Sequence, residues 1–204
     1  MKEGFSFFEY HRRALSTVFL VAGLFLVLVT QHTWVEGGTV DTVFDWAGVI
    51  LVAKGVLGRV WATMYIGGKK NSTLVTTGPY SMCRNPLYLF SFIAGLGVTV
   101  AFENLLLIGL YVLAFSLYYP NVIRSEEKRL ESIFGAEFVA YKGASPAFFP
   151  KLTGLNLGKL SDYSARLMFK NFMDGSVFIL MLPVAYIVER LHESGVLPVL
   201  LRIP

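Results

Sequence analysis

The sequence contains few cysteines, histidines and charged residues. A single cysteine, Cys83, excludes an intrachain disulfide. The three histidines, His11, His32 and His192, are scattered and no cluster has metal-ligand spacing, so the sequence predicts no metal site. Charged residues make up 16% of the 204 residues, whereas a soluble domain carries about 25%. Together with 54% hydrophobic residues, this shortage of charge indicates a membrane protein.

Internal repeats, low-complexity tracts and a separate soluble domain are also missing from the sequence. We therefore interpret residues 1–204 as a single integral membrane domain. A Gly-x-Gly-x-x-Gly motif between a strand and a helix is absent, which excludes a nucleotide site of the Rossmann type.

Several stretches approach the length of about 20 apolar residues that a bilayer-spanning helix needs. The first lacks a small-x-small cleavage pattern at its exit, so we expect a retained helix and not a signal peptide. Only Glu103 and Asn104 separate the third stretch from the fourth, which predicts a tight hairpin. The prediction is an all-α, polytopic membrane protein with about five transmembrane helices, over residues 14–30, 43–66, 87–102, 105–120 and 172–188.

Basic residues are distributed unevenly between the connecting segments. Segments 31–42 and 103–104 contain no Lys or Arg, whereas the N-terminal arm and segments 67–85 and 121–171 contain many. Basic segments remain on the cytoplasmic side of a membrane. We therefore expect the N-terminus, and any site built from the basic segments, to face the cytoplasm. Anionic lipid accounts for the basic excess, so no nucleic-acid partner is required.

The segment from Gly78 to Tyr88 opens the third apolar stretch. Gly78 and Pro79 predict a turn, and Asn85 followed by Pro86 predicts a helix N-cap with proline at the first helical position. A helix N-terminus beside Arg84 would suit a carboxylate or phosphate. The alternative is that Arg84 extends to lipid headgroups.

A second polar motif lies just beyond the fourth stretch. On a helix over residues 121–134, which we expect to be amphipathic and cytoplasmic, Glu126 falls in the middle of the apolar arc and Glu127 at its edge. A buried carboxylate is costly without partners. Glu126 is therefore expected either to pair with Arg59 or Lys54, or to bind a ligand. Both of these cations lie inside the second apolar stretch and are expected to face protein or a wet cavity.

In order and spacing, these motifs resemble the isoprenylcysteine carboxyl methyltransferases and the related phospholipid N-methyltransferases. The resemblance covers roughly residues 55–150, which leaves residues 151–204 as a C-terminal extension with the fifth helix. It rests on Arg59-Val60-Trp61-Ala62, Thr77-Gly78-Pro79-Tyr80, Arg84-Asn85-Pro86-Leu87-Tyr88, Gly95/Gly97, Glu126-Glu127, Phe134-Gly135, Tyr141 and Pro146/Pro150.

The resemblance implies that the protein is an enzyme with S-adenosylmethionine as its cofactor. It implies a catalytic role for Glu127, and Arg59 is expected to orient an acidic group of the substrate. Asn85 stands where the family usually has histidine, so a mechanism that needs a base at this position is in doubt. The residues implied to bind the cofactor are Tyr80, Arg84, Asn85, Tyr88, Gly95, Gly97, Glu126 and Glu127.

The acceptor implied by this resemblance is lipophilic and enters from the bilayer. A prenylated cysteine carboxylate, a phospholipid amine or another small amphipathic molecule would fit. Two alternatives remain open at this point. One is a reductase of sterols or steroids that uses NADPH, because such enzymes have a similar Asn-Pro-x-Tyr turn. The other is a membrane scaffold without enzymatic activity.

Overall fold

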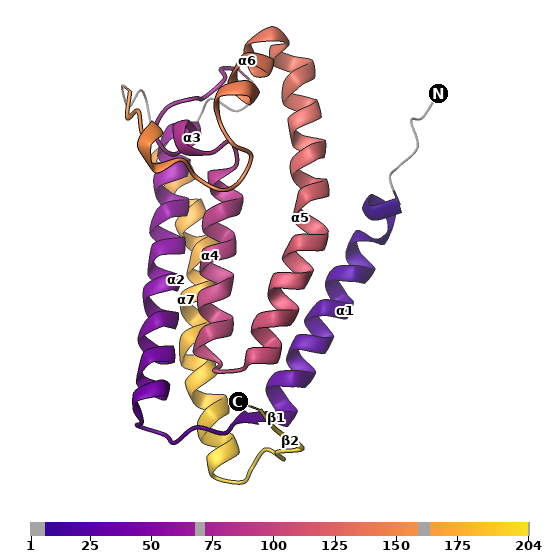
Figure 1. Cartoon of the computed structure of the whole chain (residues 1–204), viewed down its shortest axis with the longest axis vertical. Coiled ribbons are helices and arrows are strands. Elements are labelled where there is room, and N and C mark those ends of the chain that lie inside the picture. The colour runs from indigo at the N-terminus through magenta and orange to yellow at the C-terminus, as the bar shows by residue number, and fades with distance from the viewer. Residues whose placement is uncertain (1–6, 68–71, 159–163, 204) are drawn as a thin grey trace.

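The computed structural model describes residues 7–67, 72–158 and 164–203. Over these residues the chain forms long helices, short helices at one end and a two-stranded sheet at the other (Figure 1). In chain order the elements are α1 (Phe7–Val29), β1 (Thr30–His32), α2 (Thr39–Ile66), α3 (Pro79–Met82), α4 (Pro86–Ala101), α5 (Leu105–Phe134), α6 (Ala136–Ala144), the 3-10 turn η1 (Leu152–Gly154), α7 (Ala165–Glu193) and β2 (Leu201–Ile203).

The predicted all-α membrane fold is confirmed. Helices α2, α5 and α7 are each long and apolar enough to cross a membrane, and α4 and residues 17–29 of α1 are shorter apolar helices. The predicted hairpin joins α4 to α5 through residues 102–104. In this turn Asn104 caps α5, because its side chain accepts a hydrogen bond from the N–H of Leu107 at 2.9 Å.

The fourth membrane helix and the amphipathic helix are not two elements. They form one helix of 30 residues, α5, which continues through Pro120. A proline removes one backbone donor, but helices in membranes tolerate it where local adjustments satisfy the freed carbonyl. The helix ends where expected, at Gly135, whose φ of 53° is favourable for glycine. The polar motif on α5 is therefore rigidly continuous with the membrane-spanning part.

Close packing of small residues joins α2 to α4. A Cβ added to Gly97 would lie 2.6 Å from the backbone nitrogen of Val52, and one added to Gly55 would lie 2.5 Å from Ala94. Glycine and alanine let backbones approach closely, which drives helix association in lipid. Helix α7 packs against both α2 and α4, so these three helices form the centre of the bundle.

The two ends of the bundle differ. Segments predicted to be cytoplasmic lie together at one end, with α3, α6 and η1 (Figure 1). At this end the turn at Gly78 has a φ of 62°, and its N–H donates to the carbonyl of Asn156 at 2.7 Å. At the other end β1 pairs in parallel with β2, so the C-terminal tail packs onto the segment after α1.

We expect Gly97→Ala to destabilise the protein by about 1–3 kcal/mol, because the added methyl group forces α4 away from the backbone of α2. Gly109→Ala on α5 is the matched control, since a Cβ there meets nothing within 4 Å. Thermal unfolding in detergent, followed by tryptophan fluorescence, measures both. Equal melting temperatures for the two variants would contradict the packing described for α2 and α4.

Candidate functional site

A pocket of about 370 Å³ lies at the end of the bundle that carries α3 and α6. This volume is within the range of sites for small molecules and cofactors. Helices α2, α4 and α5 supply most of its wall, and residues 73–75 of the loop after α2 close one side. Its polar and aromatic lining includes Arg59, Tyr80, Arg84, Asn85, Tyr88, Ser91, Tyr119, Glu126, Glu127 and Tyr141.

Arg84 holds the elements around the pocket together. Its Nε donates to Oε1 of Glu127 at 2.8 Å, and its Nη1 donates to the carbonyl oxygens of Lys142 and Ser145. Both side chains of the Arg84–Glu127 ion pair are about nine-tenths buried. Arg84 precedes α4, Glu127 lies on α5 and both carbonyls belong to the end of α6. One guanidinium therefore fixes three elements, and this bonding rules out the alternative in which Arg84 extends to lipid headgroups.

The expected burial of the two glutamates is reversed. Glu127 is the buried carboxylate, with 7% of its surface exposed, whereas Glu126 is only half-buried. Ile133, which the sequence placed in the apolar arc, is exposed. An apolar side chain can face lipid without cost, so it does not mark the protein-facing side of a membrane helix. The inward face of this part of α5 is centred on Ile123 and Glu127 instead.

Of the two alternatives for Glu126, the pairing with Arg59 or Lys54 is not found among the described residues. Its carboxylate accepts a hydrogen bond from Tyr88, and it is Glu127 that pairs with a cation, Arg84. Lys54 is exposed on α2, contrary to the expectation that it faces protein or a cavity. Its aliphatic stem allows the ammonium to reach toward a polar interface.

Three polar side chains, Glu126, Arg59 and Tyr80, face the pocket with hydrogen-bonding capacity left for a ligand. Tyr88 donates its hydroxyl to Oε2 of Glu126 at 2.7 Å, which leaves the half-buried carboxylate able to accept more. Arg59 donates from Nη1 to Ser91. Among the described residues, however, the buried Nε of Arg59 and the hydroxyl of Tyr80 have no hydrogen-bond partner. Unpartnered buried polar groups are rare, so this pair points to a bound molecule.

Asn85 occupies the predicted N-cap position, and Pro86 is the first residue of α4. Its side chain does not cap the helix. Instead its Nδ2 donates to the carbonyl of Ala147 at 3.0 Å, while the backbone N–H of Arg84 donates to Pro146 at 2.9 Å. The segment after α6 is therefore tied to the start of α4. This arrangement uses the amide as a donor and requires no titratable side chain.

Gly95 and Gly97 are not brought to the pocket. Gly97 lies against α2, and a Cβ on Gly95 would meet the hydroxyl of Tyr111 at 2.2 Å. Both positions serve the packing of α4. The structure thus brings together seven of the predicted site residues: Arg59, Tyr80, Arg84, Asn85, Tyr88, Glu126 and Glu127.

Tyr119 and Ser91 are among the lining residues that the sequence analysis missed. Tyr119 lines the pocket and stacks on Phe115 with a ring separation of 3.8 Å. Ser91 lies three residues after Tyr88, on the same face of α4. A polar residue at this spacing in an apolar helix is the signal that could have identified it.

Cys83 lies beside these residues but is not suited to act as a nucleophile. It is 1% exposed, and burial raises the pKa of its thiol to about 11. At neutral pH it remains a protonated thiol within the protein core.

The fold and the pocket define an integral membrane protein with a polar pocket at one end of its bundle. The sequence profile of the family described as phospholipid methyltransferase matches residues 43–137. All of the pocket lining except Phe138 and Tyr141 falls within this range.

Curated relatives extend the match to nearly the whole chain. The nickel-cobalt-cadmium resistance protein NccN of Alcaligenes xylosoxydans xylosoxydans is 34% identical over 98% of this chain and 92% of its own length. The cobalt-zinc-cadmium resistance protein CzcN of Cupriavidus metallidurans is also 34% identical, over 94% and 88%. The protein-S-isoprenylcysteine O-methyltransferase of Rattus norvegicus is 28% identical over 74% of this chain and 54% of its own. No solved structure matches significantly.

The chain therefore belongs to the same family as NccN and CzcN, and its residues 43–137 carry the phospholipid methyltransferase domain, which relates it to the isoprenylcysteine methyltransferases. The resemblance stated from its motifs is confirmed. Residues 151–204, which lie outside those motifs, are shared with NccN, because that match covers nearly all of the chain.

We expect Glu127→Gln to lower the free energy of unfolding by about 3 kcal/mol, because it leaves the charge of Arg84 buried and uncompensated. The matched control is Glu131→Gln, on the same helix. Its carboxylate is 45% exposed and lies 3.7 Å from Nζ of Lys142, so its loss should cost less than about 1 kcal/mol. Denaturant titration in detergent measures both variants, and equal losses would show that Arg84 does not depend on Glu127.

Proposed function

We propose that this protein transfers a methyl group from S-adenosylmethionine to a lipophilic acceptor in the pocket between α2, α4 and α5. The observation that carries the proposal is the unpartnered Tyr80 hydroxyl and Arg59 Nε, buried in the part of the chain that matches the methyltransferase family. Membership of that family supports methyl transfer, and the pocket supplies a site for the donor.

The polar groups of the pocket fit the charges of the donor. The methionine end of S-adenosylmethionine carries an ammonium and a carboxylate, and its sulfonium supplies an electrophilic methyl group. Glu126, oriented by the hydroxyl of Tyr88, would accept hydrogen bonds from an ammonium or from ribose hydroxyls. The hydroxyl of Tyr80 would donate to an acceptor on the same molecule. The Arg84–Glu127 pair would keep these walls in place and not touch the reacting atoms.

Arg59 is the residue that we assign to the acceptor. It lies on α2, and its Nη1 is fixed by Ser91, while its Nε has no hydrogen-bond partner in the part of the chain that the structure describes. A guanidinium suits a carboxylate or phosphate group, which are the polar ends of prenylcysteine and of phospholipids. Positioning the acceptor and excluding water are then the main contributions of the chain, since methyl transfer from a sulfonium needs no general base.

The active site is proposed to face the cytoplasm. The pocket lies at the end of the bundle where the basic segments gather, which supports this orientation. A reductase that uses NADPH and a scaffold without activity are the alternatives. The family match favours methyl transfer over both.

The two relatives that match over nearly their whole length are named for resistance to divalent metal cations. We propose that methyl transfer by this chain serves cobalt, zinc, nickel or cadmium tolerance in its host. Deleting the gene should lower growth in the presence of these cations, and Glu126→Gln should fail to restore it while Glu131→Gln succeeds. Equal restoration of growth by both variants would show that metal tolerance does not depend on the pocket.

We expect detergent-purified protein to bind S-adenosylhomocysteine in isothermal titration calorimetry, and Tyr80→Phe and Glu126→Gln to weaken this binding at least about tenfold. Each substitution removes one hydrogen-bonding group without removing volume, and a bond to a charged group contributes about 1.5–3 kcal/mol. Glu131→Gln, outside the pocket, should bind as the wild type does.

A parallel titration with NADPH distinguishes the alternatives. Binding of NADPH without S-adenosylhomocysteine would assign the pocket to a reductase. Binding of neither by folded protein would favour the scaffold. Binding of S-adenosylhomocysteine that is insensitive to both pocket substitutions would place the donor elsewhere.

A further inference from the structure

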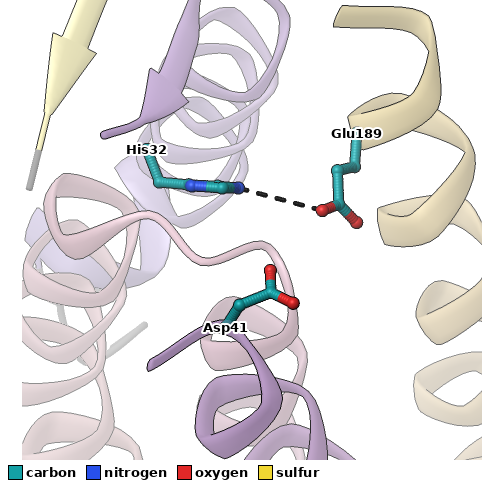
Figure 2. Close-up of side chains that lie close together, drawn as sticks. All are labelled: His32, Asp41 and Glu189. Carbon is teal, nitrogen blue, oxygen red and sulfur yellow. Dashed lines mark ion pairs between the residues drawn. The ribbon is translucent and has the colours of Figure 1, made fainter. Parts of the chain in front are cut away.

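A second polar cluster lies at the opposite end of the bundle from the pocket (Figures 1 and 2). His32 follows α1, Asp41 lies in the first turn of α2 and Glu189 lies near the end of α7. One nitrogen or oxygen atom from each side chain lies within 4.8 Å of the others. In Figure 2 the imidazole and the two carboxylates converge on a common space between three elements that are far apart in the sequence.

The side chains at the centre of this cluster are buried and incompletely bonded. His32 is 9% exposed and Asp41 is 8% exposed. Both ring nitrogens of His32 and Oδ1 of Asp41 lack a hydrogen-bond partner among the residues that the structure describes. The Nε2 of His32 is 3.6 Å from Oε2 of Glu103 and 3.8 Å from Oε1 of Glu189, which is beyond hydrogen-bonding distance.

The cluster is held in place by its surroundings. His32 belongs to β1, where it pairs with Ile203 of β2, and its ring stacks on Trp34 at 5.1 Å. The Oδ2 atom of Asp41 accepts the backbone N–H of Gly37 at 3.0 Å, so Oδ1 is turned toward the shared space. These contacts fix the donor atoms before any ligand arrives.

Negative charge is crowded at this end. Asp41, Asp45 and Glu103 form a second group whose carboxylate oxygens lie within 4.8 Å of one another. A cation placed among these groups would therefore be strongly favoured.

We propose that His32, Asp41 and Glu189 bind one divalent transition-metal cation such as zinc or cobalt. An imidazole nitrogen with carboxylate oxygens suits zinc, whose bonds to these atoms are about 2.0–2.2 Å. Magnesium and calcium prefer oxygen ligands alone, so the histidine selects against them. Two atoms bonded to one tetrahedral zinc ion lie about 3.4 Å apart. The three donor atoms already lie within 4.8 Å of one another, so small side-chain rotations bring them to that spacing. Three protein ligands also leave a coordination position for water.

This site is separate from the methyl-transfer pocket, so its test does not depend on the proposed reaction. Detergent-purified full-length protein is treated with a chelator and titrated with Zn²⁺ and with Co²⁺ by calorimetry, and the visible absorption of Co²⁺ reports nitrogen and oxygen ligation. We expect one equivalent to bind. His32→Ala, Asp41→Asn and Glu189→Gln should each lower the affinity at least about tenfold, since even the loss of an outer-shell partner costs 10–100-fold.

The matched control is His192→Gln. Its Nε2 lies 3.2 Å from the carbonyl of Leu28, so this histidine is already partnered, and the variant should bind both cations as the wild type does. Excess Mg²⁺ or Ca²⁺ should not displace Co²⁺. Gel filtration and unfolding measurements without metal identify any ligand variant that fails to fold. The remaining variants of His32, Asp41 and Glu189 then test the proposal.

Two outcomes would overturn the proposal. One is that wild-type protein binds neither Zn²⁺ nor Co²⁺. The other is that folded His32→Ala and Asp41→Asn both bind the two cations unchanged, and Glu36→Gln and Glu193→Gln are then tested for loss of binding. Such a loss would assign the cation to the exposed group of Glu36, Glu189 and Glu193.

Discussion

The ion pair between Arg84 and Glu127 is the interaction on which the pocket depends. It joins the start of α4 to the end of α5, and the same guanidinium binds the backbone after α6. Packing alone holds α4 to α2 closely, because small residues let those helices meet. Helix α5 has less support of this kind in its upper half (Figure 1). The buried Arg84–Glu127 ion pair therefore holds α5 to the start of α4, where small-residue packing does not.

This constraint separates two kinds of polar residue that look alike in the sequence. Arg84, Glu127 and Asn85 are bonded to the protein itself, so they shape the site. Tyr80 and Arg59 have buried atoms without hydrogen-bond partners among the described residues, and Glu126 is half-buried and oriented by Tyr88. These residues are the ones available to a ligand. Adjacent glutamates on one helix thus have different roles, because a rotation of 100° per residue turns one toward the protein and the other toward the pocket.

The two ends of the bundle carry different chemistry. One has a basic surface, an ion pair that is satisfied and a pocket large enough for a small molecule. The other has crowded carboxylates around His32, whose ring nitrogens lack hydrogen-bond partners among the described residues. The hairpin turn at residues 102–104 links them, since it connects the helices that line the pocket and places Glu103 beside His32. A methyltransferase core with a cation site on its far side would combine both features.

The sequence by itself determined the apolar helices, the tight hairpin, the helix start at Pro86 and the family, because each depends on local composition or on motifs in fixed order. Only the tertiary structure decided which glutamate is buried, that Gly95 and Gly97 serve packing, and that α5 continues through Pro120. It also brought His32 to Asp41 and Glu189, where scattered histidines had indicated no metal site. These outcomes depend on how the helices are rotated and on which of their faces pack together. In a membrane an apolar face does not predict this packing, because it can contact lipid as favourably as protein.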